Sequence, residues 1–199
     1  MKLRIIRRTA GLVVLAAILA ACEVDRPSFA DFGIGKKVPL PGCPTVKVLG
    51  AAGEIVQYRE GPGRDITDIV HESKLVGFTG NCEFIGDSPN FTHVKVLMRP
   101  VLDISRGPAA TGRTLDLNYF VAIPDFYPRP EGRQEMSVRV LFPENRSTVR
   151  VQDGEVSVTI PLSGGRSAPD TGIFLGFVLT EEQLRANRER RSAAGGDGR

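Results

Sequence analysis

The sequence predicts an all-β protein, an antiparallel, Ig-like β-sandwich of about seven to eight strands with a short C-terminal helix. Two features support this fold class. Apolar residues recur at every second position in successive short runs, and clusters rich in Gly, Pro, Asp and Asn separate these runs. A helical period is nearly absent before residue 180. Because the chain has no Trp, it lacks the buried tryptophan of immunoglobulin domains, and the likeness concerns architecture alone.

Each expected strand follows from its own pattern of alternation. The second run is one long strand or two strands joined at Gly80. In the third run Val94, Val96 and Met98 share one parity, and Pro100 should bend or end the strand or place it at an edge, because proline lacks a ladder N–H. The expected strands cover residues 45–49, 69–84, 91–104, 117–123, 136–142, 156–160 and 171–179.

One helix is expected after the last strand. Thr180 and Gln183 have the spacing of a capping box, in which each side chain bonds the backbone N–H of the other residue. We expect a β-sandwich domain over residues 43–179, a helix over residues 180–191 and a disordered polar tail over residues 192–199.

The N-terminus has the layout of a secretory signal. Four basic residues precede an apolar run that is too short to span a membrane, and the run ends in Leu19-Ala20-Ala21-Cys22. This motif resembles the bacterial lipobox, which implies lipidation of Cys22 after removal of a signal peptide, residues 1–21. Residues 22–42, with several Pro and Gly, are then the lipid anchor and a flexible tether. The alternative is an ordinary signal peptide that leaves Cys22 unmodified.

The predicted processing changes the charge of the chain. The full sequence carries +3, but without the signal 22 Lys and Arg face 23 Asp and Glu, a formal charge of −1. Nucleic-acid binding, which needs a basic surface, is not expected. We expect a lipid-anchored protein that faces the periplasm. Since aspartate after the lipidated cysteine is the usual inner-membrane retention signal, Glu23 favours the outer membrane.

Two further cysteines remain, Cys43 and Cys82. An even pair in an oxidising compartment favours a disulfide, which we expect to join the start of the first strand to the second or third, unlike the usual inter-sheet bridge. Two free thiols or a metal-binding pair are the alternatives, and the wide spacing is atypical of a metal site.

The sequence contains no nucleophile motif, and we expect neither an enzyme nor a cofactor. A hydrolase with a split active site has the least support. His71 and His93, assisted by Met98 or Glu72, are a candidate copper or zinc site, although surface or half-buried histidines are the simpler interpretation. Four carboxylates in the segment before the long strand are expected to lie on a solvated loop: Glu54, Glu60, Asp65 and Asp68.

Three features of the chain form a familiar pattern: residues 117–123, residues 176–184 with Asn187-Arg188, and the spacing of Cys43-Pro44 and Cys82-Glu83-Phe84. They resemble parts of uncharacterised proteobacterial envelope lipoproteins. The resemblance spans most of residues 43–188 and implies an envelope location without implying an activity. The chain departs from that pattern after residue 123, where a longer Pro-rich loop replaces a short Asp-Gly hairpin.

These observations predict a non-enzymatic binding or structural module of the cell envelope, whose partner is another envelope protein or an envelope polymer. Phe126 and Tyr127, in the Pro-rich loop, are the expected exposed apolar contact, unless the loop folds back on the sandwich. The alternative function is metal binding or metal delivery through His71 and His93.

Overall fold

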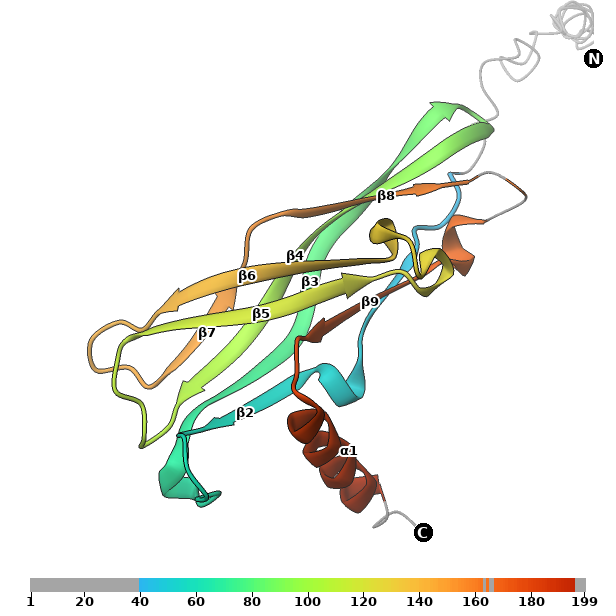
Figure 1. Ribbon diagram of the computed structural model, residues 1–199. Coiled ribbons are helices and arrows are strands. Elements are labelled where there is room, and N and C mark those ends of the chain that lie inside the picture. Colours follow the sequence, from blue (N-terminus) through green and yellow to red (C-terminus); the bar gives the residue numbers. More distant parts are fainter. Residues whose placement is uncertain (1–39, 163, 165–166, 196–199) are drawn as a thin grey trace, which may run out of the picture. The chain divides into compact units, whose positions relative to one another are not determined.

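A computed structural model describes residues 40–162, 164 and 167–195 (Figure 1). The predicted signal peptide, Cys22 and nearly all of the predicted tether lie outside the described residues. The described chain forms two β-sheets and one C-terminal α-helix, which agrees with the predicted sandwich-like all-β class.

The first sheet has four strands in the order β1-β9-β5-β6, and the second has five, in the order β2-β3-β4-β7 with β8 also paired to β4. The strands are β1 Thr45–Val48, β2 Glu54–Tyr58, β3 Ile69–Asp87, β4 Asn90–Arg106, β5 Thr114–Ala122, β6 Arg133–Leu141, β7 Thr148–Gln152, β8 Val156–Pro161 and β9 Gly172–Phe177. Short 3-10 helices connect them: η2 Gly50–Ala52, η3 Ile66–Asp68, η4 Pro124–Phe126, η5 Pro130–Gly132 and η6 Ala168–Asp170. The α-helix is α1 Glu181–Gly195.

The structure differs from the sequence prediction in strand count and pairing. It has nine strands in the described residues, because β2 and β7 form from five-residue segments that we expected to be loops. The sandwich is also not wholly antiparallel, since β1 pairs parallel to β9 from Thr45↔Gly172 to Val48↔Leu175. The helix continues to Gly195, four residues beyond its predicted end, and only residues 196–199 of the predicted tail lie outside the described residues.

The β3–β4 hairpin runs the length of the second sheet (Figure 1). β3 has 19 residues and β4 has 17, so each strand is roughly 60 Å long if fully extended. The run that the sequence leaves open as one strand or two is therefore one strand through Gly80. Because β2 pairs with the start of β3 and β8 with the start of β4, the hairpin connects the two ends of the domain.

Pro100 lies in the interior of β4, neither at its end nor in an edge strand. The strand pairs with β8 up to Met98↔Val156 and with β7 from Val101↔Gln152 onward, so Pro100 falls at the junction. Its C=O accepts from the N–H of Asp153 on that side. Since the N and C=O of one strand residue point to the same neighbour, the missing N–H faces the junction and costs no ladder bond.

The core lies between the sheets and follows the predicted alternation. Val94, Val96 and Met98 on β4 all point inward, while His93 is exposed on the other parity. Large side chains from both sheets and their connections are fully buried there. They include Tyr119, Phe142, Phe177, Met98, Leu102, Ile104, Ile123, Ile160, Ile173 and Leu175. Burial of these side chains, at about 1.5–3 kcal/mol each, supplies the main driving force for folding.

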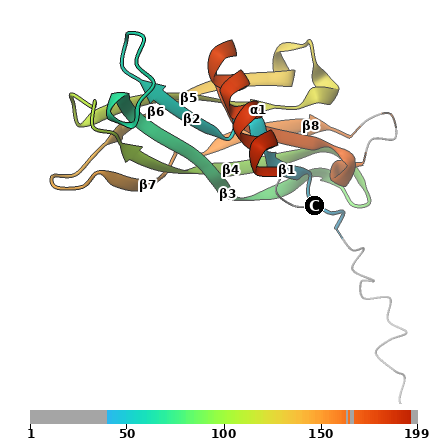
Figure 2. The ribbon, with the colours of Figure 1, turned by 90° about the horizontal axis from the view of Figure 1, so that it is seen from below.

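The two ends of the domain are built differently. The described chain begins (blue) on the side of the β3–β4 turn at one end, whereas β2 and α1 lie at the other (Figure 1). Seen from below, α1 lies alongside β2 at the outside of the sandwich (Figure 2).

Candidate functional site

A groove of about 480 Å³ lies between β2 and α1. One wall comes from Val56, Gln57 and Tyr58 of β2, and the other from the first two turns of α1, including Gln183 and Ala186. The segment between β2 and η3 adds Arg59 and Arg64 at the rim. The groove therefore joins parts of the chain that are more than 100 residues apart in sequence.

The start of α1 is fixed by the predicted capping box. The Thr180 Oγ1 accepts from the Gln183 N–H at 3.2 Å, and the Gln183 Oε1 accepts from the Thr180 N–H at 2.9 Å. The Gln183 Nε2 also donates to the Gln57 Oε1 at 3.1 Å, which ties the cap to β2. The local sequence thus sets where the helix begins.

Asn187 attaches the middle of α1 to the sheet. Its side chain is 4% exposed, and its Nδ2 donates to the C=O of Ala51 at 2.9 Å and to the C=O of Glu54 at 2.7 Å. Gly50 supports the same contact, because an added Cβ would lie 2.6 Å from the Arg191 guanidinium. A helix with few apolar residues is therefore held mainly by polar contacts, and its position depends on a few named groups.

β2 presents an unpaired backbone edge to the groove. The Leu75 N–H donates to the C=O of Gly53, so alternate residues Ile55 and Gln57 also pair with β3. The residues between them, among them Val56, turn their N–H and C=O groups away from β3. Asn187 occupies the Glu54 C=O on this side, but no described residue bonds the Val56 peptide groups.

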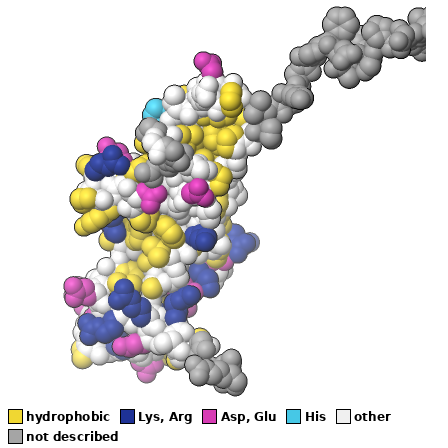
Figure 3. Space-filling model, turned by 90° about the vertical axis from the view of Figure 1, so that its right-hand side faces the viewer, with side chains coloured by type: hydrophobic (Ala, Val, Ile, Leu, Met, Phe, Trp, Pro, Cys, Tyr) yellow, Lys and Arg dark blue, Asp and Glu magenta, His cyan; other side chains and the backbone are white. Residues whose placement is uncertain are grey.

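Charged side chains at the rim are already paired, but weakly. Arg64 donates to Glu182 at 3.1 Å, with 49% and 71% of these side chains exposed, and its guanidinium lies 5.4 Å from the Tyr58 ring centroid. Exposed pairs of this kind contribute about 1 kcal/mol or less, so an incoming carboxylate could replace Glu182 at little cost. In the space-filling view, Lys and Arg side chains gather at the lower end of the molecule (Figure 3).

Two of the four carboxylates that we expected on a solvated loop lie elsewhere. Glu54 is in β2, where it pairs with Lys74 at 2.8 Å, and this pair holds the pKa of Glu54 below its usual value. Asp68 is buried, lies 2.5 Å from the Arg59 guanidinium and caps η3 together with Asp65. These carboxylates therefore fix the wall of the groove and form no cation site.

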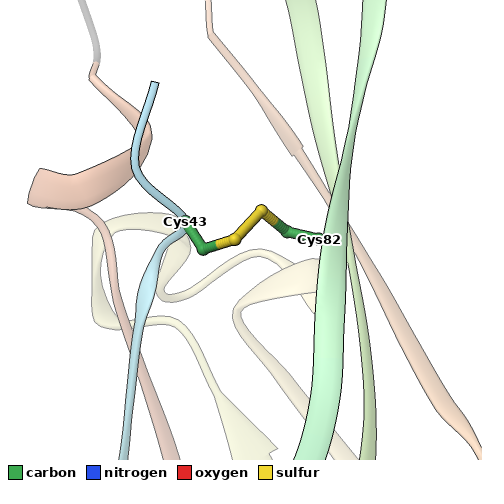
Figure 4. The surroundings of a disulfide bond; sticks show 2 residues. All are labelled: Cys43 and Cys82. Carbon is green, nitrogen blue, oxygen red and sulfur yellow. A yellow bond between two sulfur atoms is a disulfide. The ribbon is translucent and has the colours of Figure 1, made fainter. Parts of the chain in front are cut away.

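The predicted disulfide between Cys43 and Cys82 is confirmed (Figure 4). The two Cα atoms are 5.8 Å apart. Cys43 precedes β1 in the four-stranded sheet, whereas Cys82 lies in β3 of the five-stranded sheet, so the bond connects the two sheets. Our expectation that it would not be an inter-sheet bridge is wrong, because the first and third strands belong to different layers.

The two histidines lie at opposite ends of the β3–β4 hairpin. His71 pairs with Arg106 near the start of β3, while His93 pairs with Ile85 close to the turn. About 14 residues of strand separate these positions, roughly 45 Å if fully extended, so the two rings do not share a site. His71 is 5% exposed, which corrects the expectation of a surface or half-buried residue. Among the described residues, no three His, Cys, Asp or Glu side chains gather as metal ligands.

Only one of the two expected contact aromatics is exposed. Tyr127 is 76% exposed, but Phe126 is 3% exposed and packs in the core, which corrects the sequence expectation. The reason is the compact turn of η4, which folds the start of the Pro-rich loop back onto the sandwich. The loop is therefore a weaker candidate surface than the groove.

Nothing in comparisons with protein-family models, curated proteins and solved structures matches this chain. In the part of the chain that the structure describes, no helix has the length and apolar character needed to cross a membrane.

Proposed function

We propose that the chain is a bacterial envelope lipoprotein, anchored through lipid on Cys22, whose β domain is a non-enzymatic binding module facing the periplasm. The lipobox-like Leu19-Ala20-Ala21-Cys22 and its basic, apolar leader support the anchor. The confirmed Cys43–Cys82 disulfide is consistent with an oxidising compartment.

The observation that carries the binding role is the unpaired edge of β2 inside the groove. An extended segment of another protein can add there as a strand, bonding the N–H and C=O of Val56 while α1 forms the opposite wall. Near the start of the described chain, Cys43 is bonded to Cys82 in the half of β3 that leads to the β3–β4 turn, whereas β2 pairs with the opposite end of β3.

Charge favours an acidic partner segment. Three arginines line the groove, Arg59, Arg64 and Arg190, and two carboxylates, Glu60 and Glu182. Because the buried Asp68 already neutralises Arg59, charge recognition depends on Arg64, whose partner is exposed. Since the Arg64–Glu182 pair is exposed and weak, a partner carboxylate can take the place of Glu182 on the guanidinium. We therefore propose that the partner is an extended, acidic segment of another envelope protein, rather than an envelope polymer.

The test replaces Val56 with proline. Val56→Pro removes the N–H that faces the groove and spares the ladder to β3, and proline is tolerated on a strand edge. With a photo-crosslinking residue at Ala186 in intact cells, we expect a protein adduct in the unaltered chain and in Val56→Thr, and its loss in Val56→Pro. An adduct of equal yield in Val56→Pro, or adducts to a polymer alone, would overturn the proposed recognition.

The anchor has a separate test. Cys22→Ser should abolish acyl labelling and leave unprocessed precursor, because the lipid-bearing sulfur is lost. The Cys82→Ser variant serves as the control, since it alters a cysteine that takes no part in the proposed lipidation. Normal processing of Cys22→Ser would disprove the lipobox.

A further inference from the structure

We propose that a second cavity, between the paired ends of β3 and β4 and the segment that leads to β5, binds a carboxylate carried on a small apolar group. The cavity has a volume of about 160 Å³ and is lined by Val70, His71, Arg106, Thr114, Leu115 and Phe142, among others. A water molecule takes about 30 Å³ in the liquid, so the cavity has room for about five waters or a ligand of similar size.

Arg106 supplies the reason to expect an anion. Its Nε is buried and has no hydrogen-bond partner among the described residues. Its guanidinium carbon lies 5.7 Å from the centroid of the Phe142 ring, so an apolar surface covers part of the charge. A buried donor of a charged group without an acceptor is costly, and a carboxylate in the cavity can balance the charge by accepting from the other N–H groups of the guanidinium.

His71 adds a neutral polar group beside this cation. His71 and Arg106 are directly opposed in the β3–β4 ladder, so their side chains share one face of the sheet. The His71 Nδ1 lies 3.0 Å from the Oγ of Ser73, which is 3% exposed. When that hydroxyl donates to Nδ1, the neutral ring carries its proton on Nε2 and can donate a second hydrogen bond to a ligand oxygen.

The rest of the lining limits the class of ligand. Arg106 is the one charged side chain among the described residues that line the cavity. The nearby Arg113 is already engaged, since it donates to the C=O of Phe142 at 3.0 Å and to Glu144 at 3.1 Å. Val70, Leu115 and Phe142 form apolar walls. A single cation with apolar walls favours a monoanion with a short apolar body over phosphate or another multiply charged ion.

Such a carboxylate has two possible sources, a free short-chain acid or the C-terminus of a peptide that ends in a small residue. The site is separate from the groove, because it shares none of the groove's lining residues. It therefore does not depend on the proposed function.

The experiment is an NMR titration of the full chain in detergent with three probes: propionate, N-acetylalanine and N-acetylalaninamide. We expect both acids to shift amide signals of residues 106–115 with a Kd on the order of millimolar, since ligands of this size reach modest affinity. The neutral amide should bind at least about tenfold more weakly, because it lacks the charge that Arg106 recognises. The acid with the higher affinity identifies the source.

Variants provide a second measurement. Arg106→Gln should raise the Kd for the acids by about tenfold or more. Arg99→Gln, an exposed arginine of the same strand, should leave it unchanged. The comparison of acid with amide uses the unaltered protein and holds even if Arg106→Gln fails to fold. Equal shifts with acid and amide, no shifts at all, or unchanged affinity in a folded Arg106→Gln variant would each overturn the proposal.

Discussion

The two ends of the sandwich are held by different kinds of interaction. At the end where the described chain begins, a covalent bond between Cys43 and Cys82 connects the sheets. At the α1 end the helix is held by the Thr180 cap and by hydrogen bonds from one buried amide, Asn187. The first end is fixed once it is oxidised. The second end depends on contacts of about 1 kcal/mol each, which a ligand can replace.

This difference indicates where binding can be coupled to structure. Asn187 and Gln183 both hold α1 and line the proposed groove. A partner that occupies the groove must therefore either use the docked helix or displace it. At the disulfide end, a covalent bond holds the sheets together whether or not a partner is bound.

Loss of the disulfide should have the largest effect on stability. Because the two cysteines are 39 positions apart in the sequence, the closed loop should contribute about 4 kcal/mol to the free energy of unfolding. Urea unfolding of a Cys43→Ala, Cys82→Ala double variant checks this, with the reduced unaltered protein as control. An equal free energy of unfolding for the double variant and the oxidised parent would mean that the disulfide does not stabilise its end of the domain.

Burial of His71 should make stability depend on pH. Burial lowers the pKa of His71 to about 4. Between pH 6.5 and pH 4 the imidazole is therefore protonated in the unfolded state and neutral in the folded state. The free energy of unfolding should therefore fall from pH 6.5 to about pH 4, by on the order of 3 kcal/mol in total. In urea unfolding measured at each pH, the free energy of unfolding of His71→Gln should depend less on pH in this range than that of the control His93→Gln. An unchanged slope would show that the ring is not buried neutral.

Removal of the Asn187 amide should loosen α1 without unfolding the sandwich. Asn187→Ala leaves the C=O groups of Ala51 and Glu54 without their donor, at a cost of about 1–3 kcal/mol. Hydrogen exchange should accelerate in α1 and stay slow in β3 and β4. Glu189→Ala, on the exposed side of the helix, is the matched control. Uniform acceleration through the whole domain would contradict the idea that the two ends are independent.

The smallest effect is expected at the helix cap. Thr180→Ala removes the acceptor for the Gln183 N–H and should cost about 1 kcal/mol, whereas Thr180→Ser should cost less. Thermal unfolding followed by circular dichroism, together with exchange of the first α1 amides, measures the change. If Thr180→Ala matched Asn187→Ala in effect, the cap rather than the buried amide would hold the helix.

The sequence predicts well what depends on local pattern. The inward parity of Val94, Val96 and Met98, the Thr180 capping box and the Cys43–Cys82 pair all follow from spacing within one segment or from simple counting. Each of these features is determined by nearby residues or by the small number of candidates.

Features that depend on distant partners could not be predicted in this way. β2 and β7 are short segments whose strand structure comes from pairing with β3 and β4. The groove forms because Asn187 donates to the Glu54 C=O and Arg64 donates to Glu182. In each contact the two residues are more than 100 positions apart in the sequence. Phe126 is buried because a turn reverses the chain, which its residue type alone does not specify. Alternation reveals the two faces of a strand but not which segment covers them.

The position of the disulfide also decides how the domain bears mechanical load. A pull applied at Leu40 meets Cys43 three residues later, where the covalent bond transmits it to the long strand β3 in the opposite sheet. The four-residue strand β1 comes after that point, so its hydrogen bonds to β9 are shielded from peeling. Reduction of the bond would redirect the same force into β1 and make this short strand the first element to detach.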